Sequence, residues 1–328
     1  MNFHLTFSIN PLSPSIRYSD KILLMGSCFA EEMGTLLAQH KLHVTQNPHG
    51  ILYNPLSITN ALHSYLDGKL YTEADLFQHD DWWHSWDHHS RFSAYTPAQA
   101  LEKINEAQRK GMALVEEADW LVITLGTAFS YQLKETGKLA GNCHKVPGSM
   151  FYKKMLTAEE IITALDNAMH RLFFRNRKVR IIFTISPVRY VRDGVVENNL
   201  SKAILLQAVH HMVNKFDRLH YFPAYELVMD DLRDYRFFKE DLVHPNATAI
   251  QYVWEHFTKY ALAPAELSLM HAVQEIRQAM AHRPFGPETP QHRQFLARYA
   301  EKVRALQAAH PFIDLSPEAA YFGGQAPQ

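Results

Sequence analysis

A short stretch near the start of the chain changes its hydrophobic period from that of a strand to that of a helix, and this change constrains the fold most. Residues 22–25 form an apolar run of the kind that a buried parallel strand needs. Gly26 then permits a sharp turn because it has no Cβ. The apolar residues that follow have the spacing i, i+4, i+7 and i+8 of one helix face: Phe29, Met33, Leu36 and Leu37. The stretch predicts a strand, a tight turn and a helix.

Ser27 and Cys28 occupy the turn between this strand and this helix. Ser27 can cap the helix. In open α/β sheets, ligands bind in the crevice at the carboxyl ends of the strands. The free N–H groups and the positive dipole end of the helix favour an anion there, either an oxyanion or a thiolate. We therefore expect this turn to carry chemistry.

Apolar strands and amphipathic helices alternate along most of the remaining chain. We expect strands near residues 41–46, 120–126, 179–187 and 220–225, and helices near 55–66, 96–118, 157–173 and 198–216. This alternation predicts a parallel sheet covered on both faces. From about residue 262 the pattern becomes helical only, so we expect an α/β domain over 1–261 and a helical extension over 262–328.

Composition excludes several classes of function. The formal net charge of −1 gives no bulk attraction to nucleic acid or to an anionic membrane. No run approaches the roughly 20 apolar residues of a membrane span, and no signal peptide is evident. Only two cysteines occur, Cys28 and Cys143, so a disulfide framework is not expected. We expect a soluble cytoplasmic protein with neither a nucleic-acid nor a membrane partner, and the oligomeric state stays open.

No nucleotide-cofactor motif is present either. The dinucleotide fingerprint Gly-x-Gly-x-x-Gly does not follow any expected strand, and no phosphate loop ending in Gly-Lys-Ser/Thr occurs. The sequence therefore predicts neither an NAD nor an ATP site, and no cofactor is expected.

A second chemical signal lies far along the chain, where Asp241 and His244 stand three residues apart before Pro245. At this spacing both side chains can face one point, with the imidazole as general base and the carboxylate as its orienting partner. Alone, the pair is equally compatible with a helix N-cap beside an exposed histidine. Together with Ser27 and Cys28, it favours a nucleophile–His–Asp relay.

The segment Gly26-Ser27-Cys28-Phe29-Ala30 resembles the motif that names the GSCFA-domain family. Further stretches that resemble this family are residues 47–55, the His-rich segment through Ser93, and residues 142–145, 186–189 and 241–246. The resemblance covers roughly residues 3–260. The family is grouped with the SGNH (GDSL-like) hydrolases, so the resemblance implies a three-layer α/β/α flavodoxin-like fold and ester chemistry, either hydrolysis or acyl transfer.

The SGNH pattern begins Gly-Asp-Ser, with Ser as the nucleophile. The resemblance therefore aligns Cys28 with the nucleophile and Ser27 with the Asp. It favours Cys28 as the attacking group, with Ser27 as the alternative. A helix N-terminus and a nearby His both lower the pKa of a thiol. A small buried Cys that only packs under the sheet is the structural alternative.

The oxyanion hole of the SGNH pattern matches only in part. Its glycine corresponds to Gly50, for which a simple turn glycine is the alternative. Its Gly-x-Asn-Asp element falls on Gly126-Thr127-Ala128-Phe129, which contains no Asn. A missing donor typically costs about 2.7–4 kcal/mol of transition-state stabilisation. Thr127 or Asn142 could replace it.

Other residues are candidates for the substrate pocket. Asn142, His144 and Lys145 stand on a loop after a central strand, where a substrate would lie, although a structural loop anchor is as consistent with them. Arg189 could pair with a substrate carboxylate or phosphate, or with acidic side chains a few residues further on.

The segment from Trp82 to His89 contains three Trp and several His. It suits carbohydrate stacking or a substrate lid, which would bring in His88 and His89, but the favoured interpretation is an aromatic loop packed over the sheet edge. A metal site is a second hypothesis, but the spacing matches no strong metal motif, and we expect no metal. The residues considered for it are His79, His84, Asp87, His88, His89 and His144.

The favoured function is thus a hydrolase or acyltransferase that acts on a small-molecule or carbohydrate-type ester, or on a thioester. A binding protein on a retired hydrolase fold is the alternative from another class, since fold does not dictate function. The absent Asn after Gly126 is the feature that favours this alternative.

Overall fold

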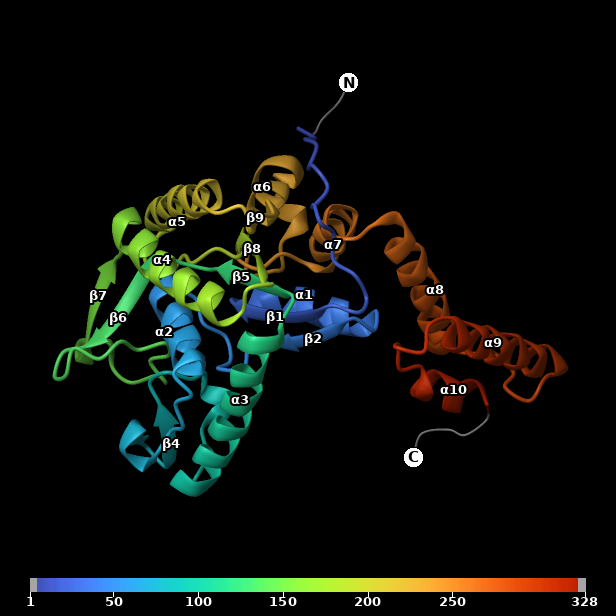
Figure 1. The fold of residues 1–328 in the computed structure, drawn as a ribbon, viewed down its shortest axis with the longest axis horizontal. Helices are drawn as coiled ribbons and strands as arrows, with labels where there is room; N and C mark the ends of the chain where they lie inside the picture. Colours follow the sequence, from blue (N-terminus) through green and yellow to red (C-terminus); the bar gives the residue numbers. More distant parts are fainter. Residues whose placement is uncertain (1–4, 324–328) are drawn as a thin grey trace.

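A computed structural model describes residues 5–323 of the chain and has a parallel five-stranded sheet at its centre (Figure 1). The strands lie in the order β2 (His43–Gln46), β1 (Lys21–Gly26), β5 (Trp120–Leu125), β8 (Arg180–Ile185) and β9 (Leu219–Tyr221). All four pairings are parallel. Counted within the sheet, the order is 2-1-3-4-5, which is the flavodoxin-like order. The predicted fold class is confirmed.

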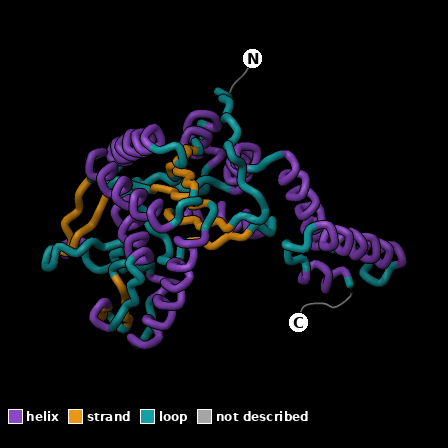
Figure 2. Tube along the Cα trace, in the orientation of Figure 1, coloured by secondary structure: helices purple, strands orange, loops and turns teal. Residues whose placement is uncertain are grey.

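Helices cover both faces of the sheet, as the tubes in Figure 2 show. Within β1, Ile22 and Leu24 belong to the core cluster on one face, and Leu23 and Met25 belong to the cluster on the other. Helices α1 (Cys28–Gln39) and α7 (Ala247–Ala261) pack on the first face, and α2 (Pro55–Leu66), α3 (Pro97–Glu117), α4 (Ala158–Arg175) and α5 (Val195–Lys215) pack on the second. The buried strands are therefore apolar on both sides.

Gly26 brings the end of β1 close to β5. It adopts φ +136°, and a Cβ built there would lie 2.1 Å from the carbonyl oxygen of Thr124. Only glycine fits this backbone, because a side chain would collide with the neighbouring strand. The chain then enters α1 directly, with Ser27 as the N-cap residue. The predicted strand, turn and helix are all present.

In the described part of the chain, two antiparallel hairpins lie outside the central sheet, and the sequence did not predict them. They are formed by β3 (Leu76–His79) with β4 (Trp82–Ser85), and by β6 (Phe129–Leu133) with β7 (Phe151–Met155). The short helical turns are Glu73–Asp75, Ser90–Phe92, Gly148–Met150, α6 (Ala224–Glu226), Leu227–Leu232 and Tyr235–Phe237. The connection from β6 to β7 carries residues 142–145, so this hairpin decides where that loop lies.

Up to residue 323, three helices follow α7 and project from the α/β body (Figure 1). They are α8 (Pro264–Ala281), α9 (Pro290–Ala309) and α10 (Ser316–Phe322). They contact the carboxyl end of α1. Lys41 pairs with Glu318 at 2.8 Å, and the Arg277 guanidinium donates to the side chain of Gln39 at 2.8 Å. The domain boundary at residues 261/262 falls between α7 and α8 and stays a prediction.

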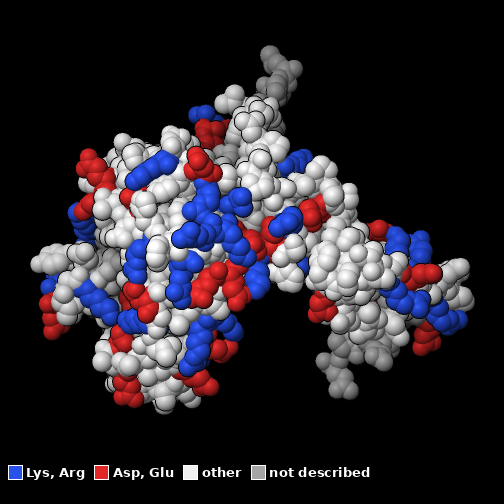
Figure 3. Space-filling model, in the orientation of Figure 1, with Lys and Arg blue, Asp and Glu red and all other residues white. Residues whose placement is uncertain are grey.

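Charged side chains are spread over the visible surface of the molecule. On the face shown in Figure 3, basic and acidic side chains are interspersed over the body and the helical extension. Across residues 5–323, no helix is both long enough and apolar enough to cross a bilayer.

Candidate active site

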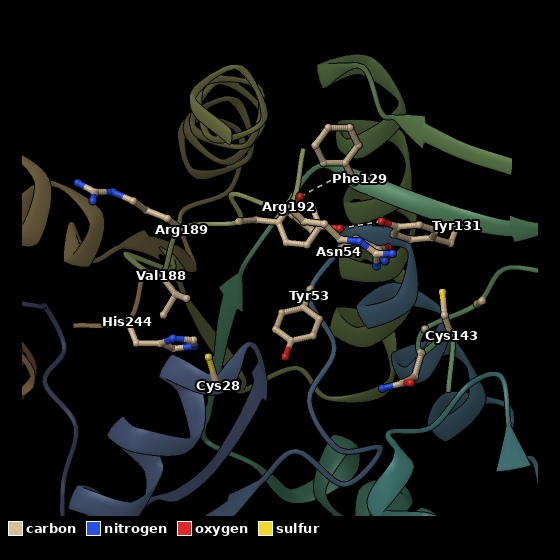
Figure 4. A pocket seen from close by; sticks show the side chains of 15 residues that line it. Cys28, Tyr53, Asn54, Phe129, Tyr131, Cys143, Val188, Arg189, Arg192 and His244 are labelled. Carbon is tan, nitrogen blue, oxygen red and sulfur yellow. Dashed lines mark hydrogen bonds between the residues drawn. The ribbon is translucent and has the colours of Figure 1, made fainter. Parts of the chain in front are cut away.

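A pocket of about 330 Å³ is lined by Cys28 from the first motif of the sequence and by His244 from the second. Cys28, from the start of α1, and His244, from the loop before α7, both line it, and Figure 4 shows the imidazole of His244 pointing toward the sulfur of Cys28. The other lining residues are Tyr53, Asn54, Thr127, Phe129, Tyr131, Ala140, Gly141, Asn142, Cys143, Val188, Arg189, Tyr190 and Arg192. The fold thus joins two segments that are distant in sequence.

Cys28 is the first residue of α1 and is partly buried. Burial raises the pKa of its thiol, and the nearby carboxylates of Glu32 and Glu31 raise it further. The backbone N–H groups of Phe29 and of Cys28 itself hydrogen-bond to the sulfur and act in the opposite direction. The net direction is upward, so the thiol needs a base or a positive charge to become a nucleophile.

Ser27 does not share the position of Cys28. Its side chain is buried, it does not line the pocket, and its hydroxyl has no hydrogen-bond partner among residues 5–323. Its backbone N–H donates to the carbonyl of Thr124 at 3.1 Å. Of the two predicted nucleophiles, Cys28 is the one whose side chain reaches the pocket.

Asp241 orients His244. The Nδ1–H of His244 donates to Oδ2 of Asp241 at 2.7 Å. Oδ1 accepts the backbone N–H groups of Val243 at 2.9 Å and of His244 at 3.0 Å, and these backbone bonds, followed by the bond from the imidazole, lower the pKa of Asp241 to about 2. The carboxylate therefore stays charged, and Nε2 is the imidazole nitrogen left for proton transfer.

Arg189 fixes the loop that carries this pair and does not reach toward a substrate. Its guanidinium donates to the carbonyl of Leu242 at 3.2 Å and lies over the ring of Phe238, 4.3 Å from the ring centre. Its backbone N–H donates to the carbonyl of Val243 at 3.2 Å. Figure 4 shows the guanidinium directed away from the pocket. We expected Arg189 to pair with a substrate anion or with an acidic side chain a few residues further on. In the structure it is bonded to the loop before His244 instead.

Neither predicted glycine presents its N–H group to the pocket. The N–H of Gly50 donates to the carbonyl of Asn47 at 2.7 Å, and at φ +80° Gly50 packs so closely on His89 that a Cβ would lie 2.2 Å from the Cβ of that residue. The N–H of Gly126 donates to the carbonyl of Tyr53 at 2.8 Å. Gly50 therefore matches its alternative interpretation as a turn glycine, because its donor is already used.

Asn142 is better placed than Thr127 to replace the missing Asn. Both line the pocket, but the hydroxyl of Thr127 accepts the N–H of Phe129 at 3.1 Å and contacts the hydroxyl of Ser201 at 3.2 Å. The side-chain carbonyl of Asn142 accepts the N–H of His144 at 2.8 Å. Its amide nitrogen has no partner within residues 5–323, so two N–H groups remain available for a substrate oxygen.

His144 anchors the loop, and neither it nor Lys145 lines the pocket. The Nε2–H of His144 donates to the carbonyl of Ser85 at 2.8 Å, and its other ring nitrogen contacts the hydroxyl of Ser90 at 3.2 Å. Burial lowers the pKa of His144 to about 4, so its ring is neutral. Lys145 is exposed and, like His144, has a left-handed backbone.

His88 belongs to a buried stack and His89 to a turn, and neither lines the pocket. The ring of His88 stacks on that of His49 at 4.1 Å between centres and 9° between planes. The hydroxyl of Ser85 is hydrogen-bonded to Nδ1 of His88 at 2.9 Å, and Nδ1 of His89 accepts the N–H of Arg91 at 3.3 Å. Within the described part of the chain, no three His, Cys, Asp or Glu residues are arranged to hold a metal ion.

The sequence did not predict Arg192 or the aromatic wall of the pocket, which is formed by Tyr53, Phe129, Tyr131 and Tyr190. Tyr131 lies on the unpredicted strand β6, and its hydroxyl is 2.7 Å from that of Tyr190. Arg192 lies close enough to lower the pKa values of Tyr131 and Cys143, although burial raises both. Among residues 5–323 it forms no salt bridge, and the pocket lining includes no Asp or Glu. The only local signal was its place shortly after β8, where Arg189 drew attention instead.

Comparison with known proteins identifies family models over most of the chain. The model of the GSCFA family matches residues 21–257, and that of the GSCFA domain protein, C-terminal domain, matches residues 273–326. No curated protein matches.

Two of the solved structures that are similar to this chain share 10% sequence identity with it. An acetyl xylan esterase from the rumen bacterium Butyrivibrio proteoclasticus aligns over 77% of this chain and 66% of its own, with a TM-score of 0.41. A carbohydrate esterase family 3 protein from Talaromyces cellulolyticus aligns over 78% of this chain and 99% of its own, with a TM-score of 0.37. This chain therefore spans just under two thirds of the first esterase.

Proposed function

The chain belongs to the GSCFA family, and from that premise we propose that it cleaves an ester or thioester through a relay of Cys28, His244 and Asp241. One observation carries the proposal: the thiol and the imidazole line the same pocket, while the second imidazole nitrogen is bonded to a charged carboxylate. A nucleophile, a base and a group that orients the base are the three parts that covalent acyl chemistry needs.

The first half of the reaction forms an acyl-enzyme. Nε2 of His244 takes the proton from the sulfur of Cys28, and the thiolate attacks the substrate carbonyl carbon. The tetrahedral intermediate collapses when the C–O or C–S bond of the ester or thioester breaks, and the imidazolium returns the proton to the leaving alcohol or thiol. Asp241 remains ionised throughout and stabilises the imidazolium.

The second half releases the acyl group. His244 takes a proton from water, the resulting hydroxide attacks the thioester on Cys28, and the proton returns to the sulfur as the acid leaves. An alcohol in place of water would give acyl transfer by the same steps. The side-chain amide of Asn142 is the proposed donor to the oxyanion, and a donor of this kind is worth about 2.7–4 kcal/mol.

The charge of the pocket suggests the kind of substrate. Arg192 contributes a positive charge that no Asp or Glu of the lining neutralises, and Tyr53, Phe129 and Tyr131 contribute aromatic surface. A guanidinium binds carboxylates and phosphates well, and aromatic faces bind apolar groups and sugar rings. We therefore propose a small ester that carries both an anionic group and an apolar or sugar moiety.

A panel of activated acyl esters and thioesters tests the proposed activity. Wild type is expected to release the alcohol or thiol, and Cys28→Ala is expected to release none above the uncatalysed rate. Cys28→Ser is the matched variant, because it keeps a nucleophile of similar size. Turnover by Cys28→Ala equal to that of wild type would exclude Cys28 as the nucleophile, and the absence of turnover by wild type on the whole panel would count against the proposal.

A ligand-binding protein on a degenerate hydrolase fold is the second candidate. Two observations favour it: burial raises the pKa of the Cys28 thiol, and the segment after Gly126 lacks the Asn of the SGNH pattern. This candidate predicts that anionic esters raise the melting temperature without being cleaved. Product formation by wild type that depends on Cys28 would exclude it.

A further inference from the structure

A buried lysine lies beneath the floor of the pocket. Lys202, on α5, is 1% exposed, and its Nζ donates to the carbonyls of Gly126 and Ser186, each at 2.6 Å. These carbonyls lie just beyond the ends of β5 and β8. Among residues 5–323, no carboxylate forms a salt bridge with this ammonium group. A buried charge that only carbonyl dipoles compensate is costly, so its retention calls for an explanation.

The surroundings of Lys202 point to Cys28. Gly126 immediately precedes Thr127, which lines the pocket, so Nζ lies one peptide unit below the lining. Burial lowers the pKa of Lys202 to about 7, and the negative charge of Cys28 acts in the opposite direction. The ring of Tyr225 also lies near Nζ, with its centre 5.9 Å away. Cys28 begins α1 directly after β1, the strand beside β5, so its thiol stands at the same edge of the sheet as the two carbonyls that hold Nζ. From this placement, the thiolate of Cys28 is the anion best placed to compensate the lysine.

We propose that Lys202 is a positioning residue whose buried ammonium group stabilises the negative charge that forms on Cys28. The positive charge of Lys202 would supplement His244 in favouring the thiolate of the partly buried Cys28. The effect is mutual: a thiolate at Cys28 favours the ammonium form of Lys202, and the ammonium form favours the thiolate. The catalytic consequence rests on the proposed function, but the effect on the thiol does not.

The same face of α5 provides a matched control. Asn198, Ser201 and Lys202 are all buried at positions i, i+3 and i+4, and each holds a segment at the carboxyl edge of the sheet. The hydroxyl of Ser201 accepts the N–H of Ala128 at 2.7 Å, and the side-chain carbonyl of Asn198 accepts that of Tyr190 at 2.8 Å. Ser201→Ala therefore loosens the same floor without removing a charge.

The test measures the rate of Cys28 alkylation by iodoacetamide as a function of pH, in a Cys143→Ser background so that one thiol remains. Lys202→Met is expected to move the midpoint of the profile upward by about one pH unit, which lowers the rate at neutral pH about tenfold. Ser201→Ala is expected to keep the midpoint of the parent. An unchanged midpoint in Lys202→Met, or an equal shift in Ser201→Ala, would overturn the proposal.

A reciprocal measurement covers the case in which Lys202→Met does not fold, as judged by near-UV circular dichroism. The ¹³Cε resonance of Lys202 is followed through a pH titration in wild type and in Cys28→Ser, which keeps the shape of the side chain. The midpoint for Lys202 is expected to be higher in wild type, because only the thiol can supply the anion. Equal midpoints would refute the coupling. Neither experiment uses an ester, so a failure of the Lys202–Cys28 coupling can be distinguished from a failure of the proposed function.

Discussion

Histidines occur in two regions of this molecule, and the two regions use them in opposite ways. At the carboxyl edge of the sheet, the side chain of His244 is 42% exposed and bonded to a carboxylate. In the His-rich region around β3 and β4, His49 and His88 stack on each other in the interior. Burial lowers the pKa of His49 to about 3 and that of His88 well below its ordinary value. The first histidine lines the pocket with a carboxylate beside it, and the stacked pair stays neutral.

The difference shows that the partner of a histidine and its access to solvent decide whether the imidazole can take part in proton transfer. Desolvation penalises the imidazolium, whereas a neighbouring carboxylate favours it. His49 is bonded to the hydroxyl of Tyr65 at 2.5 Å, a partner that compensates no charge. Asp241 supplies that compensation to His244. The His-rich segment is therefore packed structure, in agreement with the simpler interpretation of its sequence.

The largest expected effect is a loss of activity when His244, the histidine of the pocket, is replaced. His244→Ala should lower kcat/KM for an activated ester by about 10²–10⁴-fold, because general-base assistance is lost. Its side chain is half exposed, so the melting temperature should stay close to that of wild type. Steady-state kinetics and a thermal melt check this prediction. Full activity in the folded variant would remove His244 from the relay.

The converse substitution should affect stability. His88→Ala removes a fully buried ring that stacks on His49 and is hydrogen-bonded to Ser85, and it leaves a cavity. A loss of about 2–4 kcal/mol in the free energy of unfolding is expected. Urea denaturation measures it. If His88→Ala unfolds at the same urea concentration as wild type, the stacked pair does not hold the region together.

The stacked pair also predicts how stability depends on pH. The pKa values of His49 and His88 are lowered in the folded state, so between about pH 6.5 and 3 the unfolded chain binds protons that the folded chain does not. Stability should be unaffected by these groups above about pH 6.5 and should fall below it, by up to about 1.4 kcal/mol per pH unit for each histidine.

Urea midpoints measured from pH 7 to pH 4 check this dependence. In His49→Gln, a residue that does not titrate replaces one of the two groups, so the decline should be shallower than in wild type. An equally steep decline in the variant would attribute the acid sensitivity to other groups.

The smallest expected effect concerns the charge of the substrate. Arg192→Gln should lower kcat/KM for an ester that bears a carboxylate by about tenfold and leave that for a neutral ester of equal size nearly unchanged. Arg189→Gln is the informative comparison, because Arg189 turns away from the pocket and holds the loop before His244. It should reduce the rates for both esters alike. A loss of preference in Arg189→Gln alone would reverse the two assignments.

Local sequence signals predicted most of the α/β body. The helix expected over residues 55–66 is present with these limits, and Asn54 caps it by accepting the N–H of Ser57 at 2.9 Å. The strand expected near 120–126 is β5, and its six residues are all buried. These elements were predictable because their apolar periods and caps are encoded within a few neighbouring residues.

The hairpin of β6 and β7 could not be predicted in the same way. Phe129 pairs with Met155, and the two strands are joined by a long, mostly irregular connection that contains only the short helical turn Gly148–Met150. Strand pairing at this distance depends on where the chain returns, which no short window of sequence contains. For the same reason, only the structure shows the aromatic wall and shows that Asn142 lines the pocket with Cys28.

The sequence by itself determined that Gly26, Cys28, Asp241 and His244 carry the recognisable motifs and that an α/β sheet would present them. Only the tertiary structure decided which side chains face the pocket. It turned Ser27 inward and Arg189 outward, and it buried Lys202, whose position on a helix suggests nothing unusual. The physical reason is that periodicity and capping act over one or two turns, whereas burial and charge compensation depend on segments that meet only when the chain folds.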